Sequence, residues 1–181
     1  MVLIFSASPN KNGLTDACCR AAITGIEKAG GQYEYIDLSA MKIRSCQICN
    51  DGWGPCRNEH YCVIDDGLSQ LQQKMDQADS VMLITPVYWW QPCERMQFFL
   101  SRVRRCEAKK PDKGVVTEKK VNMVAAAGGS GNGLPQALLE MENWCRHMGA
   151  IPHERIGINR FNRESMLGVI ELVAGNLVVP Q

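Results

Sequence analysis

The sequence predicts an α/β protein whose core is an open, doubly wound parallel sheet of five strands with helices on both faces. Short apolar runs alternate with longer segments of helical periodicity along the whole chain, a pattern typical of parallel βαβ units. Gly and Pro mark many of the borders between these segments. At 181 residues the chain has the size of one ordinary domain, which we place over residues 1–181.

Each expected element follows from a local signal. Apolar runs place strands at residues 2–5, 33–38, 80–85, 121–127 and 151–158. Helical spacing places helices at residues 15–29, 67–77, 92–105, 134–148 and 164–176. Gly30 stops the first helix and Gly149 the fourth, since glycine adopts the left-handed conformation common just after a helix. Pro86 is expected to end the third strand, and Pro92 to open the third helix, because proline suits the first turn of a helix.

Composition and charge exclude several classes of protein. Hydrophobic residues make up 45% and charged residues 22% of the chain, and the formal net charge is +1, so the protein has no strong field to attract nucleic acid or an acidic membrane. No apolar run reaches the length of about 18 residues that a transmembrane helix needs, and the first residues lack the basic start of a signal peptide. Nine cysteines in a chain with long periodic segments favour a reducing compartment over a secreted disulfide scaffold. We therefore expect a cytoplasmic protein with no nucleic-acid or membrane partner.

The loop after the first strand has the residues of a phosphate site. Ser8 and Thr15 offer hydroxyls, and Asn10 and Asn12 offer amides. Gly13 lets the backbone approach a ligand, and the free N–H groups and dipole of the helix that starts here favour an anion. An ordinary turn that caps the helix would use the same residues, so this loop alone does not decide between the two interpretations. The spacings of the dinucleotide fingerprint and of the Walker loop are both absent.

Two further strand ends carry residues suited to a flat ring. Residues 86–92 hold an aromatic triplet between two prolines, which makes a stiff, apolar wall against which a heteroaromatic ring can stack. Trp90, the last of the triplet, fits a core or interface position equally well. Residues 128–133 contain four glycines, which permit close approach of the backbone to a ligand. Because parallel sheets bind ligands at the carboxyl ends of their strands, the three loops together predict a ligand site at that edge.

The three loops resemble those of the NAD(P)H-dependent FMN reductase and iron–sulfur flavoprotein family, within the flavodoxin-like superfamily. The matching runs are Ser-Pro-Asn-Lys-Asn-Gly-Leu-Thr at 8–15, Thr-Pro-Val-Tyr-Trp at 85–89 and Gly-Gly at 128–129. The resemblance extends over residues 1–150, and the closing strand and helix follow in register. It implies a flavodoxin-like sheet with strand order 2-1-3-4-5, FMN as the cofactor and NAD(P)H as the electron donor.

The resemblance also implies a set of cofactor contacts. In the family the first loop wraps the FMN phosphate, and the two later loops hold the isoalloxazine ring. Carried over to this chain, the phosphate contacts are Ser8, Asn10, Asn12, Leu14 and Thr15. The ring contacts are Pro86, Val87, Tyr88, Trp89, Gly128 and Gly129. No residue stands out as a catalytic acid or base.

A long, irregular, cysteine-rich insertion spans residues 39–66 and carries four candidate metal ligands. They are Cys46, Cys49, Cys56 and Cys62. Four cysteines match the ligand count of an iron–sulfur cluster or a structural zinc ion. The resembling iron–sulfur flavoproteins, however, separate their second and third cysteines by only two residues, where this chain has six. A cluster, a zinc ion and free redox thiols therefore all stay open. The other five cysteines lie on expected helices and are interpreted as packing residues.

The function that these features favour is that of an FMN-dependent oxidoreductase, which passes electrons from NAD(P)H through FMN to a quinone, a flavin or another acceptor. An iron–sulfur flavoprotein that carries electrons between protein partners is the first alternative. Dedicated flavodoxin-type carriers are strongly acidic, whereas this chain has a net charge of +1. A thiol-based metal-binding or regulatory protein is the second alternative.

Aromatic residues near the expected ligand edge favour a homodimer or homotetramer. They are Trp53, Trp89, Trp90, Phe98 and Phe99. Because aromatic residues are enriched in protein interfaces, we expect them to form a surface through which a second copy completes the flavin pocket.

Overall fold

Five parallel strands form the central sheet, in the order that was expected. They are β1 (Val2–Ser6), β2 (Tyr33–Asp37), β3 (Ser80–Tyr88), β5 (Lys120–Ala127) and β6 (Ile151–Asn159). Their spatial order is β2-β1-β3-β5-β6, which is the flavodoxin-like order 2-1-3-4-5 when the parallel strands are counted along the chain. The structure, a computed structural model, describes residues 1–178. The last three residues of the domain expected over 1–181 therefore lie outside the described part.

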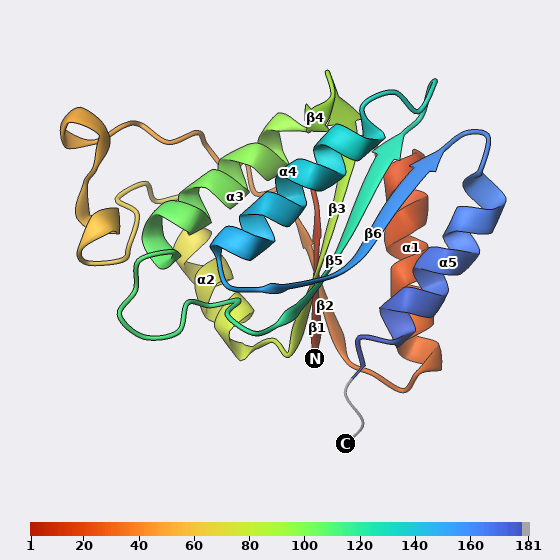
Figure 1. Ribbon diagram of the computed structural model, residues 1–181, viewed down its shortest axis with the longest axis horizontal. Helices are drawn as coiled ribbons and strands as arrows, with labels where there is room; N and C mark the ends of the chain where they lie inside the picture. Colours follow the sequence, from red (N-terminus) through yellow and green to blue (C-terminus); the bar gives the residue numbers. More distant parts are fainter. Residues whose placement is uncertain (179–181) are drawn as a thin grey trace.

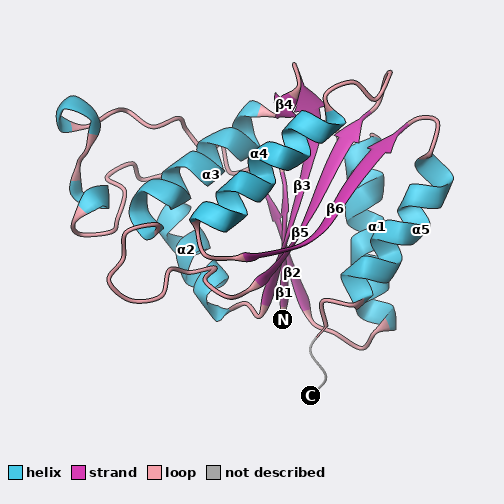
Figure 2. Cartoon of the chain, in the orientation of Figure 1, coloured by secondary structure: helices cyan, strands magenta, loops and turns pink. Residues whose placement is uncertain are grey.

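Helices cover both faces of this sheet. They are α1 (Leu14–Lys28), α2 (Leu68–Gln77), α3 (Glu94–Glu107), α4 (Leu134–His147) and α5 (Arg163–Gly175). Helices α1 and α5 lie side by side on one face, and α2, α3 and α4 cover the other (Figures 1 and 2). Each helix layer buries its own hydrophobic core against the sheet. Across residues 1–178, no helix has both the length and the apolar character needed to cross a membrane.

The central strands are buried on both faces, as their apolar sequences require. In β1, Leu3 and Phe5 belong to the core beneath α2, α3 and α4, whereas Ile4 belongs to the core beneath α1 and α5. All three side chains are fully buried, which is typical of a central parallel strand. On the second face α1 and α5 pack so closely that a Cβ at Gly25 would lie 1.9 Å from the Glu171 carbonyl oxygen. Only glycine fits at that crossing.

The cysteine-rich insertion lies against α3 on the side of the molecule away from α1 and α5 (Figure 1). It contains two short 3₁₀ helices, η1 (Asn50–Gly52) and η2 (Pro55–Arg57). Arg95 of α3 donates to the Ile43 carbonyl oxygen at 2.6 Å. Arg102 of α3 donates to the carbonyl oxygens of Arg44 and Ile64, at 3.2 and 3.3 Å. Side chains of a core helix therefore anchor the backbone of an otherwise irregular segment.

The prediction that Pro86 ends the third strand is wrong, because β3 continues to Tyr88. Strand β1 pairs with β3 only as far as Ile84. Pro86 therefore lies beyond that ladder, and its missing N–H removes no hydrogen bond to β1. On the other side of β3, Pro86 keeps its register with Ala126 of β5.

A sixth strand of two residues, β4 (Gln91–Pro92), pairs antiparallel with the end of β3, and the sequence does not predict it. Trp89 and Trp90 make the turn, with φ angles of 49° and 66°. Two-residue turns with both residues in the left-handed region usually contain Asn-Gly, so this hairpin carries no recognisable sequence signal. The left-handed conformation costs a side-chain-bearing residue about 1–2 kcal/mol. Trp89 is 87% exposed and its indole packs edge-on against Trp90, with ring centroids 5.3 Å apart, so packing offsets only part of that cost.

Replacing Trp89 with Asn is therefore expected to stabilise the fold. Asn tolerates a left-handed φ, so the free energy of unfolding should rise by about 0.5–1 kcal/mol. The corresponding increase in melting temperature is about 2 °C. Scanning calorimetry of wild type and Trp89→Asn, compared in the same oligomeric state, measures this change.

Two control variants separate backbone strain from loss of the side chain. Glu118 is also exposed and has a φ of 64°, so Glu118→Asn should give a gain of the same sign. Tyr88 is exposed but lies in a strand, so Tyr88→Asn should give no gain. A lower melting temperature for Trp89→Asn would mean that the indole makes a stabilising contact, and the strain account would be wrong.

Candidate functional site

The three predicted loops meet at one edge of the sheet, because the strands that precede them are parallel. The Ala7 N–H donates to the Ile84 carbonyl oxygen at 3.2 Å. The Cys93 thiol donates to the Ala7 carbonyl oxygen at 3.0 Å, so the first loop is joined to the second. The third loop touches the hairpin at Gly133, where a Cβ would lie 2.6 Å from the Trp90 Cα. All three loops are thus neighbours, at the upper edge of Figure 1.

The first loop is folded around its own polar side chains. The Asn10 N–H donates to Ser8 Oγ at 3.2 Å, and the Asn12 N–H donates to Asn10 Oδ1 at 3.1 Å. Ser8 is half-buried, whereas Asn10 and Asn12 are exposed. The residues predicted to contact phosphate therefore use part of their hydrogen-bonding capacity to shape the loop and keep the rest open to solvent.

The start of α1 leaves hydrogen-bond donors free. Its N-cap residue is Gly13, which has no side chain to cap the helix. Thr15 is only 4% exposed, and its hydroxyl makes no hydrogen bond within residues 1–178. The Leu14 side chain packs on the core beneath α1 and α5, so only its backbone N–H can contact an anion. Together with the unpaired N–H groups of the first turn, this arrangement suits a phosphate.

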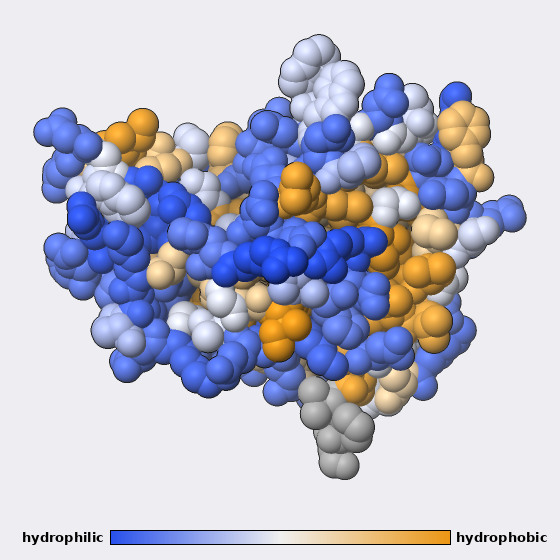
Figure 3. All heavy atoms as spheres, viewed as in Figure 1, coloured by the Kyte–Doolittle hydropathy of each residue, from blue (hydrophilic) through white to orange (hydrophobic). Residues whose placement is uncertain are grey.

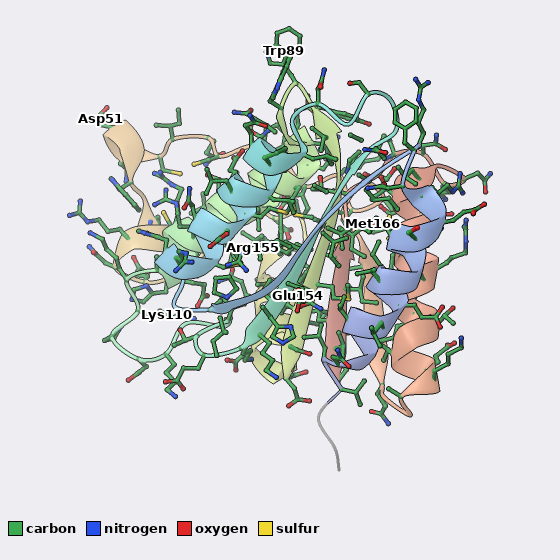
Figure 4. The ribbon with its side chains drawn as sticks, turned by 45° about the vertical axis from the view of Figure 1, so that its right-hand side comes forward. Asp51, Trp89, Lys110, Glu154, Arg155 and Met166 are labelled. Atoms are coloured by element: carbon green, nitrogen blue, oxygen red, sulfur yellow. The ribbon has the colours of Figure 1, made fainter. Side chains whose placement is uncertain are left out.

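The residues of the second loop become more exposed toward the hairpin tip. Pro86 is buried, Val87 is half-buried, Tyr88 is 42% exposed and Trp89 is 87% exposed. Partial burial of the phenol raises the pKa of Tyr88, so its hydroxyl stays protonated and can donate a hydrogen bond. Trp89 stands clear of the tip of the hairpin (Figure 4).

A cleft of about 460 Å³ opens beside β1 and β3, where the strand order reverses. It is lined by Ala7, Pro9, Ser39, Tyr88, Cys93, Glu94, Arg95 and Phe98. Of the predicted site residues, Tyr88 lines it directly and Ser8 lies between two lining residues in the sequence. The size of the cleft and its mixture of apolar walls with a few polar groups are typical of a small-molecule site.

Seven residues of this lining are absent from the predicted FMN contacts: Ala7, Pro9, Ser39, Cys93, Glu94, Arg95 and Phe98. Phe98 was expected at this edge only as an interface aromatic. Ser39 Oγ is buried and has no hydrogen-bond partner within residues 1–178, so it is a polar group that a ligand could satisfy. The expected helix start near Pro92 was a usable signal for the three residues of α3, because parallel strand ends and helix starts lie at the same edge. Ser39 had no such signal.

Gly128 and Gly129 are exposed and lie outside the lining of this cleft. A Cβ on either residue would meet no atom within 4 Å, so the edge of a ligand can approach their backbone freely. Gly131 is more constrained, with a φ of 84° and a Cβ position 2.6 Å from Asn159 Nδ2. The glycine loop thus contacts Asn159 at Gly131, whereas the backbone at Gly128 and Gly129 is accessible to a ligand.

The expected aromatic surface is not a single surface. Phe99 is fully buried and packs on Phe5, with ring centroids 4.5 Å apart, because the helical repeat of α3 turns it toward the core. Trp53 lies in the insertion, where the Arg105 guanidinium is 4.2 Å from its ring centroid. Among the five aromatics, Trp89 and Trp90 remain exposed at the ligand edge, at 87% and 44%.

The four candidate metal ligands lie around a second, smaller cavity. Cys46, Cys49, Cys56 and Cys62 all line it, and its volume is about 20 Å³, close to the space of one water molecule. No three Cys, His, Asp or Glu side chains in the described part of the chain are close enough to share a metal ion. A structural zinc ion needs four ligands on one centre, so the arrangement does not fit zinc.

The chemistry of this cavity fits an iron–sulfur cluster better. A four-iron cluster binds each thiolate at a separate iron, so its cysteines need not converge on one point. Arg102 and Arg105 line the same cavity, and the Nε of each is buried without a hydrogen-bond partner in residues 1–178. Cationic donors of this kind suit an anionic, sulfur-rich group. The cavity must widen to admit one, and the outer part of the insertion, around Asp51, stands away from the sheet (Figure 4).

The five other cysteines are buried, as expected of packing residues. They are Cys18, Cys19, Cys93, Cys106 and Cys145, and Cys106 also lines the cysteine cavity. Burial raises the pKa of Cys18 and of Cys145 to about 12, and that of Cys19 to about 11. The thiols of Cys18, Cys19 and Cys145 therefore stay protonated at neutral pH and are poor ligands or nucleophiles.

One similar protein is described as an iron–sulfur flavoprotein. The chain is 30% identical over 132 residues to an iron–sulfur flavoprotein of Methanocaldococcus jannaschii. The match covers 73% of this chain and 64% of that protein, so the chain spans less than two thirds of the relative's length.

Solved structures share the fold. A structure described as NAD(P)H:quinone oxidoreductase from Methanothermobacter marburgensis superposes with a TM-score of 0.74 at 18% identity, covering 97% of this chain and 96% of that one. A flavodoxin from the domain Archaea gives a TM-score of 0.64 at 14% identity, covering 98% and 96%. Both confirm the flavodoxin-like fold. The sequence matches the NADPH-dependent FMN reductase family over residues 1–160, and the chain belongs to that family.

Proposed function

We propose that this chain is an FMN-dependent oxidoreductase that passes electrons from NAD(P)H through FMN to a quinone, a flavin or another acceptor. The observation that carries the proposal is the cleft between β1 and β3, with a phosphate-type loop at one end and an aromatic hairpin at its wall. Flavodoxin-like sheets bind FMN at this reversal of strand order. Membership of the FMN reductase family supports the same function.

The proposed FMN contacts follow the two ends of the cofactor. The phosphate is held by Ser8, Asn10, Asn12, the Leu14 N–H and Thr15, at the start of α1. The ring is held by Pro86, Val87, Tyr88, Trp89, Gly128 and Gly129. Ser39 joins them because it lines the cleft and its buried hydroxyl has no partner within residues 1–178.

The chain's own part in the reaction is to orient FMN and to exclude water from the cleft. FMN supplies the redox chemistry when bound, accepting a hydride and passing electrons onward. The Tyr88 hydroxyl, held protonated, donates a hydrogen bond at the wall of the cleft. The hairpin and the first loop close two sides of the cleft, and NAD(P)H and the acceptor use the side left open.

A second candidate function is that of an iron–sulfur flavoprotein that carries single electrons between protein partners. The observation that favours it is one cavity lined by the four thiols of the insertion, by Cys106 and by two arginines with unpaired Nε donors. In this reading Cys46, Cys49, Cys56 and Cys62 are the cluster ligands. The name of the Methanocaldococcus jannaschii relative is consistent with it.

Purified protein is expected to be yellow and to release FMN rather than FAD, because the first loop is sized for one phosphate. Mass spectrometry of the released cofactor identifies it. Steady-state oxidation of NADH and of NADPH, with a quinone or free flavin as acceptor, then separates the two candidates, since an enzyme turns over with these reagents alone and a carrier does not. FAD as the native ligand would contradict the proposed site, and no turnover with any acceptor would contradict the enzyme.

Thr15→Ala is expected to weaken FMN binding ten- to a hundredfold. The substitution removes a charge-assisted hydrogen bond in a buried position, worth about 1.5–3 kcal/mol. Thr15→Glu should weaken binding further, since its carboxylate would face the phosphate. Titrating FMN and riboflavin into each apo-protein measures the effect.

Riboflavin is the control ligand because it lacks the phosphate, and its affinity should be almost the same in wild type and Thr15→Ala. Thr117→Ala is the matched control variant, since Thr117 is half-buried and hydrogen-bonds the Met148 carbonyl oxygen away from the cleft. Equal losses of FMN and riboflavin affinity in Thr15→Ala would assign Thr15 a purely structural role.

We also propose a homodimer or homotetramer. At the ligand edge Trp89 is 87% exposed, Trp90 44% and Tyr88 42%, an aromatic surface that a second copy can cover. A further apolar region lies along α5 (Figure 3), where Leu172 is 66% and Val169 36% exposed. A homotetramer needs two different contact surfaces on each chain. The aromatic surface at the ligand edge and the apolar region along α5 are two such surfaces.

Light scattering at micromolar concentration is expected to return the mass of a dimer or tetramer. Leu172→Glu should reduce a tetramer to a dimer and leave FMN content unchanged, because α5 lies away from the cleft. A monomer mass for wild type refutes the proposal.

A cytoplasmic location is proposed as well. All nine cysteines are free thiols, a state that a reducing compartment maintains.

A further inference from the structure

Arg102 is a charged residue placed in the protein interior. It lies on α3 and is 1% exposed, and its Nη1 and Nη2 donate to the Asp66 carboxylate at 2.5 and 3.0 Å. Burial opposes ionisation of Asp66, but hydrogen bonds from Arg102 and from the Arg44 N–H outweigh it and hold the pKa of Asp66 below its usual range. The two buried charges thus neutralise one another.

The same guanidinium reaches the cysteine cavity. Arg102 Nη2 donates to Cys62 Sγ at 3.2 Å, so the sulfur atom is held next to a positive charge. Arg105 lies one helical turn further along α3. Its Nη2 donates to the Gly52 carbonyl oxygen, and its plane sits over Trp53. Both arginines are therefore fixed in place on the wall of the cavity.

One donor on each arginine is left without a partner. The Nε atoms of Arg102 and Arg105 are buried and have no acceptor within residues 1–178. Leaving a buried, charged donor unpaired is costly, and here two such donors belong to side chains that line one cavity with the four thiols of the insertion and with Cys106 of α3. Cationic N–H donors favour an anionic acceptor, and cysteine thiolates are the ligands of iron–sulfur clusters.

We propose that Arg102 and Arg105 form the cationic wall of an iron–sulfur cluster site, with their Nε–H groups as donors to sulfur and with Arg102 positioning Cys62. The inference rests on the iron–sulfur reading of the insertion and adds to it two residues that are not ligands. Four thiolates and inorganic sulfide are the acceptors that both Nε–H groups lack. Arg102 and Arg105 are positioning and tuning residues.

The two arginines affect the reduction potential of the cluster. Reduction adds one electron to the cluster and changes no bond to the protein. Hydrogen bonds to sulfur and nearby positive charge stabilise the more negative, reduced state, so the arginines raise the potential. A donor that favours the reduced state tenfold corresponds to about 59 mV for a one-electron couple.

The experiment uses the full chain, reconstituted anaerobically with iron and sulfide. Iron, acid-labile sulfide and FMN per chain are measured first, and the cluster potential is then determined by redox titration followed by electron paramagnetic resonance. Arg105→Met is expected to keep its FMN and to shift the potential downward by about 59 mV for a tenfold effect. Arg105→Lys keeps the charge but lacks Nε, so its shift should have the same sign and be smaller.

Arg57→Met is the matched control. Arg57 belongs to the same insertion and also lies over Trp53, at 5.6 Å, but it is exposed and outside the cavity lining. Its removal should leave the potential unchanged. Arg102→Lys keeps a cation beside Asp66 and loses the fork that holds Cys62, so it should retain less iron per chain than wild type.

Each outcome bears on a separate claim. Wild type that takes up no iron, while holding FMN and oxidising NAD(P)H, overturns this inference and leaves the reductase function standing. Wild type that binds no FMN contradicts the reductase function instead. A full cluster whose potential is the same in Arg105→Met as in wild type, or shifts equally in Arg57→Met, overturns the role of the arginines. Circular dichroism and FMN content confirm that each variant is folded, because the FMN cleft lies at the other end of α3.

Discussion

The hydrogen-bond ladders on the two sides of β1 are the constraint on which the candidate FMN site depends. β1 pairs in parallel with β2 on one side and with β3 on the other, so the connections after β1 and β3 run in opposite directions across the sheet. A crevice remains between them. Ala7 from the first connection and Tyr88 from the second line that crevice. Residues far apart in the chain become neighbours there because all strands point the same way.

Helix α3 joins the two candidate sites. Arg95, in its first turn, lines the strand-end cleft, and Arg102 lines the cysteine cavity. With a rise of 1.5 Å per residue, the two positions are about 10 Å apart along the helix axis. Phe99 and Val103 are fully buried and hold the helix on the sheet. The geometry between the cleft and the insertion is therefore set by one rigid, well-packed element and not by the irregular segment itself.

Left-handed backbone and unpaired polar groups occur at both candidate sites, although Glu118 has a left-handed φ away from either of them. Trp89 and Trp90 adopt left-handed φ angles beside the cleft, and Ile48, a β-branched residue with a φ of 53°, does so in the insertion. Ser39 Oγ lacks a partner at the first site, and Arg102 Nε lacks one at the second. Such features reduce stability and persist where the surrounding structure holds them, most often at ligand sites. The combination of left-handed backbone with an unpaired buried polar group is found at the cleft and in the insertion.

The sequence by itself determined the five parallel strands and the five helices, because periodicity is a local property. It also placed the polar loop at residues 8–15 between the first strand and the first helix. Only the tertiary structure decided the β3–β4 hairpin, whose Trp89-Trp90 turn lacks the usual turn residues. It alone placed Ser39 in the cleft and paired Arg102 with Asp66, 36 residues apart. Such contacts depend on how distant segments pack together, and no local pattern of residues encodes them.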